Sequence, residues 1–210
     1  MFCHWYYGGK DCAITREQAA NQNNIIYTDG GHKTLILAVK SNDFLILAGD
    51  SRVHYPKTGY YHDSMKKIFA YNDTLLVGGF GSEMFISNLD HHLTQRFTTK
   101  KQERTLQLEE ALNEFTDMAV KQWQSFTQLT TNARKLGIGY LIFGFNSEGT
   151  PQMFLSFPEN SFATCIYTMS KIAALGTDSI VTAYGEDLLR CAESLEDYKL
   201  AVVYLLWTST

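Results

Sequence analysis

A hydroxyl group, a carboxylate and a guanidinium group are expected to meet at one end of a short segment. Residues 34–52 read TLILAVKSNDFLILAGDSR, in which two apolar runs are separated by the turn-forming residues 41–43. The two runs predict a β-hairpin, which returns the chain close to the point where its first strand begins. Thr34 is therefore expected beside Asp50 and Arg52. Such a group at the open end of a hairpin is more typical of a site than of a hydrophobic core.

The pattern of the remaining chain predicts the elements that position this group. Residues 66–71 and 74–80 form a second predicted hairpin, around an Asn-Asp turn. Further elements follow: helices in 82–97 and 105–127, strands in 139–146, 152–157 and 164–169, and helices in about 179–192 and 196–207. This order predicts an α+β fold in which two sheets pack face to face between helices, a four-layer αββα sandwich.

Two of the predicted helices carry clear apolar stripes. In the first, Ser82 is the expected N-cap, and the stripe consists of Met84, Phe85, Leu89, Leu93 and Phe97. In the second, the stripe consists of Leu106, Leu108, Leu112, Phe115, Ala119 and Trp123. Residues 51–64 are expected to form a polar, aromatic loop, and residues 1–33 show no sustained periodicity.

Composition narrows the class of protein. A chain of 210 residues with 45% hydrophobic residues is long enough for one well-buried core. The net charge is −4 and the basic residues are scattered, so neither a nucleic-acid partner nor a membrane surface is expected. The four cysteines are far apart and indicate free thiols in a reducing compartment. Without a secretion signal or an apolar run approaching ~20 residues, a cytoplasmic protein is expected.

Four blocks of sequence resemble proteasome β-subunits and their bacterial relative, the HslV peptidase. The first block is the hairpin, in which Lys40 matches the family's basic residue without a gap. The others are MKKI at 65–68, GGFGS at 78–82 and, more weakly, ALGTDS at 174–179. The resemblance implies an N-terminal nucleophile (Ntn) hydrolase fold over residues 34–210. Residues 1–33 would then be a propeptide, or an N-terminal extension that stays attached.

The resemblance also implies which residues act. Thr34 would be the nucleophile, and its own α-amino group, with a pKa of about 8, would be the base. That amine becomes free only if the bond between Lys33 and Thr34 is cleaved, so the hypothesis includes self-processing. Lys67 would place a positive charge close to the hydroxyl group, and Asp50 would keep Lys67 ionised. Lys66 is the competing match, because neighbouring strand residues face opposite sides.

Three further positions would complete the site. Gly81 matches the glycine whose backbone N–H faces the scissile carbonyl group, where an oxyanion develops. Thr177 stands where the family usually has a serine that hydrogen-bonds the terminal amine, and it retains the hydroxyl group. Arg52 would support this group of residues. No metal ion or organic cofactor is implied.

The family function implied here is that of a threonine-type endopeptidase. Its substrates would be peptides or unfolded proteins. Its partners would be other subunits of a homo- or hetero-oligomeric ring and an ATP-dependent unfoldase.

The sequence also departs from the family pattern. Active members have glycine before the catalytic threonine, whereas Lys33 stands there and would crowd the bond to be cleaved. The family continues beyond the last predicted helix with closing strands that this sequence lacks. One sheet edge is therefore expected to be unprotected unless residues 1–33 substitute for those strands.

Other functions remain as alternatives. The first is a catalytically silent subunit of the same fold, with a structural or interaction role. Another is a small-molecule amidase that uses Cys3, which would require loss of residues 1–2. The pair His91 and His92 resembles a metal site, but adjacent helical residues point about 100° apart and cannot both bind one ion.

Overall fold

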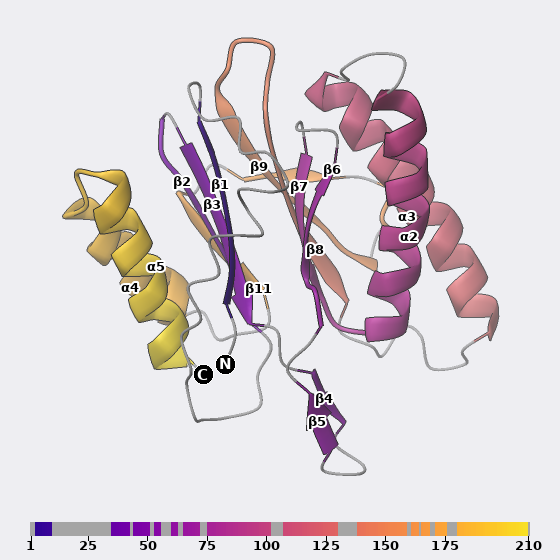
Figure 1. Ribbon diagram of the computed structural model, residues 1–210, viewed down its shortest axis with the longest axis horizontal. Coiled ribbons are helices and arrows are strands. Elements are labelled where there is room, and N and C mark those ends of the chain that lie inside the picture. Colours follow the sequence, from indigo (N-terminus) through magenta and orange to yellow (C-terminus); the bar gives the residue numbers. More distant parts are fainter. Residues whose placement is uncertain are drawn as a thin grey trace. The chain divides into compact units, whose positions relative to one another are not determined.

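The computed structural model divides into two compact units, residues 1–68 with 170–210 and residues 69–169, each with its own sheet (Figure 1). It describes residues 3–9, 35–42, 44–50, 53–55, 60–62, 65–71, 75–101, 107–129, 138–158, 161–163, 165–168, 171–175 and 180–209. Within these ranges there are two large antiparallel sheets and four helices, which confirms the predicted α+β class.

The first unit contains a four-stranded antiparallel sheet in the order β1-β3-β2-β11. Its strands are β1 (Cys3–Gly9), β2 (Ile36–Lys40), β3 (Phe44–Asp50) and β11 (Ile172–Leu175). The hairpin predicted from residues 34–52 is present: β2 and β3 pair antiparallel, with Ile36 opposite Gly49 and Lys40 opposite Leu45. A separate two-stranded ribbon consists of β4 (Val53–Tyr55) and β5 (Tyr60–His62).

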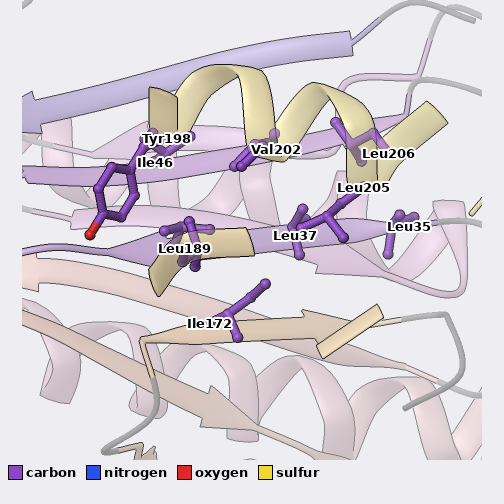
Figure 2. Close-up of a cluster of buried hydrophobic side chains, with 12 residues drawn as sticks. Leu35, Leu37, Ile46, Ile172, Leu189, Tyr198, Val202, Leu205 and Leu206 are labelled. Carbon is purple, nitrogen blue, oxygen red and sulfur yellow. The ribbon is translucent and has the colours of Figure 1, made fainter. Parts of the chain in front are cut away.

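Two helices cover one face of this sheet, α4 (Ile180–Arg190) and α5 (Leu195–Ser209). Alternate residues of β2 and β3 point toward them, because side chains along a strand alternate between its two faces. The resulting core, shown in Figure 2, includes Leu35, Leu37, Val39, Ile46, Ala48, Ile172, Leu189, Tyr198, Val202, Leu205 and Leu206. At Gly185 an added Cβ would overlap Cδ1 of Ile172, so the glycine permits close packing of α4 on β11.

The second unit contains a five-stranded sheet in the order β10-β9-β8-β7-β6. Its strands are β6 (Ile68–Tyr71), β7 (Leu75–Phe80), β8 (Gly139–Phe145), β9 (Pro151–Ser156) and β10 (Ile166–Tyr167). The helices are α2 (Glu83–Lys101) and α3 (Leu108–Leu129). Aromatic side chains dominate this core, with Phe85 and Phe115 completely buried and Tyr140 2% exposed. Ring contacts of 5.2 to 6.3 Å join Phe85 to Trp123, Phe126, Tyr140 and Phe162.

The structure corrects two expectations, for residues 51–64 and for Met84, and it bears on a third, the sheet edge. Residues 51–64 are not simply a loop, because they include β4 and β5. Residues 1–33 contain a strand, β1, which pairs with β3, in agreement with the alternative that this segment protects a sheet edge. Met84 is 55% exposed and lies off the apolar stripe of α2, and Ile86 is buried instead. No helix in the described part of the chain is long and apolar enough to cross a membrane.

Candidate active site

The predicted site residues fall on both described and undescribed parts of the chain. Asp50 is the last residue of β3, and Lys67 directly precedes β6. Gly81 connects β7 to α2 in the second unit. Thr34, Arg52 and Thr177 lie outside the described residues, and so does Lys33.

The strand register fixes which ends of the hairpin meet. Ile36 at the start of β2 pairs with Gly49, and Asp50 follows Gly49 directly. Leu35, the residue after Thr34, is completely buried at this same end of the sheet. The hairpin therefore returns the backbone at Asp50 to the place where the chain enters β2.

Gly49 marks a point where three segments converge. A Cβ added there would lie 2.6 Å from Cδ1 of Ile36, 3.3 Å from the carbonyl oxygen of Leu35 and 3.6 Å from Cδ1 of Ile68. Leu35, Gly49 and Ile68 are the immediate sequence neighbours of Thr34, Asp50 and Lys67. The structure thus brings together the backbone segments that carry the nucleophile, the carboxylate and the lysine of the sequence-based hypothesis.

The two neighbouring lysines have opposite environments. Lys67 is 3% exposed, whereas Lys66 is exposed to solvent. A buried ammonium group requires hydrogen-bonding or anionic partners, because removing it from water without them costs several kcal/mol. Lys67 is consequently the lysine whose environment suits a charged residue held inside a site.

Gly81 lies at a sharp change of direction in the backbone. Its φ is 110°, a conformation that side chains with a Cβ rarely adopt. Ser82 follows as the N-cap of α2: the backbone N–H of Phe85 donates to its Oγ at 3.5 Å, and that of Ile86 to its carbonyl oxygen at 3.0 Å. A strand that turns directly into a helix leaves backbone N–H groups available to an oxyanion.

The sequence reasoning did not single out Gly49. The signal was available, since a glycine inside an otherwise apolar strand often marks a close approach of another segment. A similar close approach occurs at Gly79, where an added Cβ would lie 3.1 Å from both Ile86 and Tyr140. Only the convergence of β2, β3 and the start of β6 shows which glycine lies beside the candidate site.

Other candidate groups lie elsewhere. His91 and His92 are exposed on α2, with ring centroids 5.6 Å apart. Among the described residues there is no group of three side chains suited to hold a metal ion. Burial raises the pKa of the Cys165 thiol, which makes it a poor nucleophile at neutral pH. Cys3 begins β1 and pairs with Asp50.

Comparisons with known proteins agree with this geometry. A family model described as "Proteasome subunit" matches residues 32–204, which include the hairpin, Lys67 and Gly81. The comparison with curated proteins found no match.

Proposed function

Because the chain belongs to the proteasome subunit family, we propose that it is a threonine-type endopeptidase subunit that hydrolyses peptide bonds with Thr34 as N-terminal nucleophile. The family relationship is to proteasome β-subunits and HslV-like Ntn hydrolases, and it supports the expected α+β sandwich fold, with two antiparallel sheets and four helices in the described residues. Residues 34–210 would form the hydrolase domain, and residues 1–33 the segment removed by processing.

One observation carries the proposal. Leu35, Gly49 and Ile68, the sequence neighbours of Thr34, Asp50 and Lys67, come together, and Lys67 itself is only 3% exposed. A hydroxyl group at the start of a strand and a carboxylate at the end of the next are ordinary, but a buried lysine beside Ile68, in the third converging segment, needs an explanation. A nucleophile whose proton loss is assisted by a nearby positive charge supplies it.

The reaction proceeds through two steps of acyl transfer. The free α-amine of Thr34 accepts the proton of the hydroxyl group while Oγ attacks the carbonyl carbon of the substrate. The resulting oxyanion is stabilised by the backbone N–H of Gly81, and the departing amine takes the proton as the C–N bond breaks. Water then attacks the ester between Thr34 and the acyl group, which releases the second product and restores the hydroxyl group.

Supporting residues act on the charge and orientation of this centre. The ammonium group of Lys67 favours the deprotonated Oγ, and the carboxylate of Asp50 keeps Lys67 charged. The hydroxyl group of Thr177 hydrogen-bonds the terminal amine, and Arg52 supports the acidic end of the hairpin. These assignments come from matching positions in the family pattern.

Partners follow from family membership. Members of this family typically form oligomeric rings, so this chain is proposed to assemble with copies of itself or with related subunits. Its substrate class would be peptides or unfolded proteins delivered by an ATP-dependent unfoldase, in the cytoplasm.

The test combines processing with activity. Intact-mass measurement of the purified protein should show a product that begins at Thr34, and that product should react with a threonine-directed epoxyketone and hydrolyse peptides. Thr34→Ala should remain full length and inactive. A wild-type chain that stays full length and unreactive would exclude this function.

The second candidate function is a catalytically silent subunit of the same family. The observation that favours it is Lys33, which stands where active members have glycine and adds a side chain beside the bond to be cleaved. Lys33→Gly separates the two candidates: it should speed the release of residues 1–33 if Thr34 is competent, and it should leave a silent subunit full length.

A further inference from the structure

Strand β1 lies along the full length of β3. Seven consecutive residue pairs join them, from Cys3 opposite Asp50 to Gly9 opposite Phe44. On its other side β3 pairs with β2, so β3 is an interior strand of the sheet only because β1 is present (Figure 1). The pairing involves residues from the segment that precedes the proposed cleavage point.

The strand covered by β1 is deeply buried. From Leu45 to Ala48 no residue of β3 is more than 1% exposed. The backbone N–H and C=O groups of such a strand need hydrogen-bond partners, and a long apolar edge without them tends to pair with other chains. β1 meets this need along one side of β3.

The hydrogen-bonded pairing of β1 with β3 does not depend on the chain segment that links β1 to β2. β1 and β2 are both antiparallel to β3, so they run parallel to each other on its two sides. Parallel strands cannot be joined by a tight turn, and Gly9 and Ile36 lie at opposite ends of β3, opposite Phe44 and Gly49. A cut in that connection removes the covalent link without removing any pair of the β1–β3 ladder.

We propose that the edge of β3 is a binding site for residues 3–9, which remain bound as a separate strand after the chain is cut before Thr34. The proposal rests on the proposed function in so far as the cut is made by the chain itself. Recognition is of an extended peptide through backbone hydrogen bonds, in the manner of strand addition to an open sheet edge. The processed protein is then a complex of two chains.

An engineered cut tests retention independently of self-processing. In a Thr34→Ala chain, residues 25–31 are replaced by the recognition sequence of a site-specific protease, and the purified protein is cut and passed through gel filtration. Masses are measured for the eluted peak under native and denaturing conditions. We expect the released N-terminal peptide to co-elute in equimolar amount and to separate only on denaturation. Loss of the peptide during gel filtration overturns the proposal, whether or not the remainder stays in solution.

A matched pair of variants tests whether β1 holds the peptide. Along an edge strand, the backbone N–H groups point alternately toward and away from the partner strand. Proline has no backbone N–H group, so the double variant Tyr6→Pro and Tyr7→Pro must remove one hydrogen bond that β1 donates to β3. The control is Gln22→Pro with Asn23→Pro, between β1 and β2. After cutting, the amount of peptide that stays bound should be about tenfold lower in the proline variant of β1 than in the control, or lower still. Equal retention by the two variants overturns the proposal.

The two proposals fail in distinguishable ways. If the wild-type chain is never cut at Thr34 while the engineered chain retains its peptide, the proposed function is wrong and the strand-binding edge stands. If the wild-type chain is cut and residues 1–33 are absent from the native complex, the peptidase stands and retention is wrong.

Discussion

Lys67 and Ser156 are the buried polar or charged residues among those that the structure describes, with 3% and 0% of their surface exposed. Burying an unpaired serine hydroxyl group costs about 1–3 kcal/mol, whereas an unpaired ammonium group costs several kcal/mol more. Replacing a whole buried ion pair by apolar residues is often neutral or stabilising, so stability alone does not explain a buried lysine. The next residue, Ile68, lies beside Gly49, which directly precedes Asp50, and this favours a role of Lys67 in chemistry.

The first prediction separates chemistry from stability at this residue. Lys67→Met keeps the length of the side chain and removes the charge, so peptide hydrolysis should fall by about 10²-fold or more. The free energy of unfolding should fall as well, because removing one partner of a buried ion pair leaves the other without its counter-charge, so hydrolysis is compared under conditions in which both proteins are fully folded. The measurements are kcat/KM for a peptide substrate and urea unfolding.

Lys66→Met is the matched control, since Lys66 is exposed and adjacent. It should leave kcat/KM within about twofold of the wild type. A loss of activity in Lys66→Met equal to that in Lys67→Met would show that the assignment of the lysine is wrong.

A second prediction concerns the space at Gly49. In Gly49→Ala the new methyl group would lie 2.6 Å from Cδ1 of Ile36 and 3.3 Å from the carbonyl oxygen of Leu35. The side chain of Ile36 can rotate away from the new methyl group. The carbonyl group of Leu35 cannot do so, because it belongs to the backbone next to Thr34. We expect kcat to fall by about tenfold or more, because small displacements of a nucleophile are costly. Unfolding should become easier by about 1–3 kcal/mol.

Gly185→Ala provides the comparison for that variant. Its added methyl group would overlap Cδ1 of Ile172 in β11. Ile172 pairs with Val39, which lies at the end of β2 opposite to Ile36. It should destabilise the fold to a similar degree and change kcat much less. Equal losses of kcat in the two variants would attribute the effect to general destabilisation.

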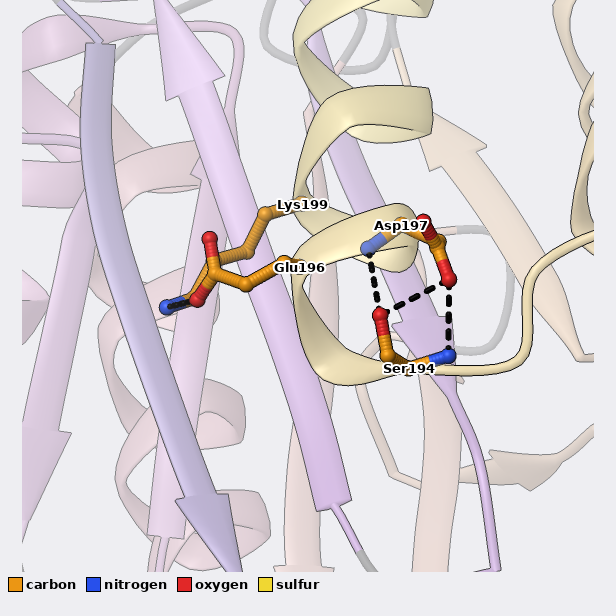
Figure 3. Close-up of polar contacts among 4 residues, drawn as sticks. All are labelled: Ser194, Glu196, Asp197 and Lys199. Carbon is orange, nitrogen blue, oxygen red and sulfur yellow. Dashed lines mark hydrogen bonds and ion pairs between the residues drawn. The ribbon is translucent and has the colours of Figure 1, made fainter.

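The N-terminus of α5 is a compact polar arrangement at the scale of one element (Figure 3). The carboxylate of Asp197 accepts hydrogen bonds from the hydroxyl group of Ser194 at 2.7 Å, from its N–H at 2.9 Å and from the N–H of Glu193 at 3.3 Å. The N–H of Asp197 donates to Oγ of Ser194 at 3.2 Å. This is a capping box, which satisfies backbone donors that a helix leaves unpaired.

The cap predicts a dependence of stability on pH. The hydrogen bonds from the Ser194 hydroxyl group and from the two backbone N–H groups lower the pKa of Asp197. The stabilisation is therefore fully present above the pKa of the unfolded state and is lost as the pH falls through the lowered pKa of the folded state. Asp197→Asn should lower the melting temperature by about 2 °C at neutral pH and by less near about pH 2.

Glu196→Gln is the control for this prediction. Glu196 is 75% exposed and pairs with Lys199 at 2.7 Å on the surface, where ion pairs contribute little. Its melting temperature should stay close to that of the wild type at both pH values. A difference between Asp197→Asn and the wild type that does not shrink in acid would contradict the capping role of the carboxylate.

The sequence predicted some helices and strands better than others, because only some of them have a regular spacing of apolar residues. The hairpin of β2 and β3 and the helices α3, α4 and α5 carry long apolar patterns, so their predicted bounds agree closely with the structure. β1 reads CHWYYGG, with neither alternation nor an aliphatic run, and its partner β3 lies far along the chain. β4 and β5 have three residues each, too few to establish a period.

For the candidate site, the sequence predicted where each residue lies along its strand better than how deeply its side chain is buried. The spacing of the hairpin residues placed Asp50 at the end of β3, where the structure has it. The choice between Lys66 and Lys67 rested on resemblance, because adjacent lysines have the same composition and charge. Their difference in burial arises from contacts between segments distant in sequence, which no local pattern contains.

At the scale of the whole molecule, each of the two units has a core of its own. The core of the first unit is mainly aliphatic and joins β2, β3 and β11 to α4 and α5. In the second unit, Phe115 of α3 packs edge to face on Tyr140 of β8 at 5.3 Å. Composition counts apolar residues without showing how the contacts divide them between the two units.

The division predicts a crossed pattern of hydrogen exchange in two core variants. Val202→Ala opens a cavity against β2 and β3, and Phe115→Leu removes a ring contact of β8, each costing about 1–3 kcal/mol. A loss of packing that opens the structure locally lowers protection mainly in the strands that contact the substituted residue. Val202→Ala should therefore accelerate amide exchange in β3 about tenfold more than in β8, and Phe115→Leu should do the reverse. Mass spectrometry of peptides from the two strands measures both rates in one sample, and equal acceleration in β3 and β8 by either variant would show that the two cores open together.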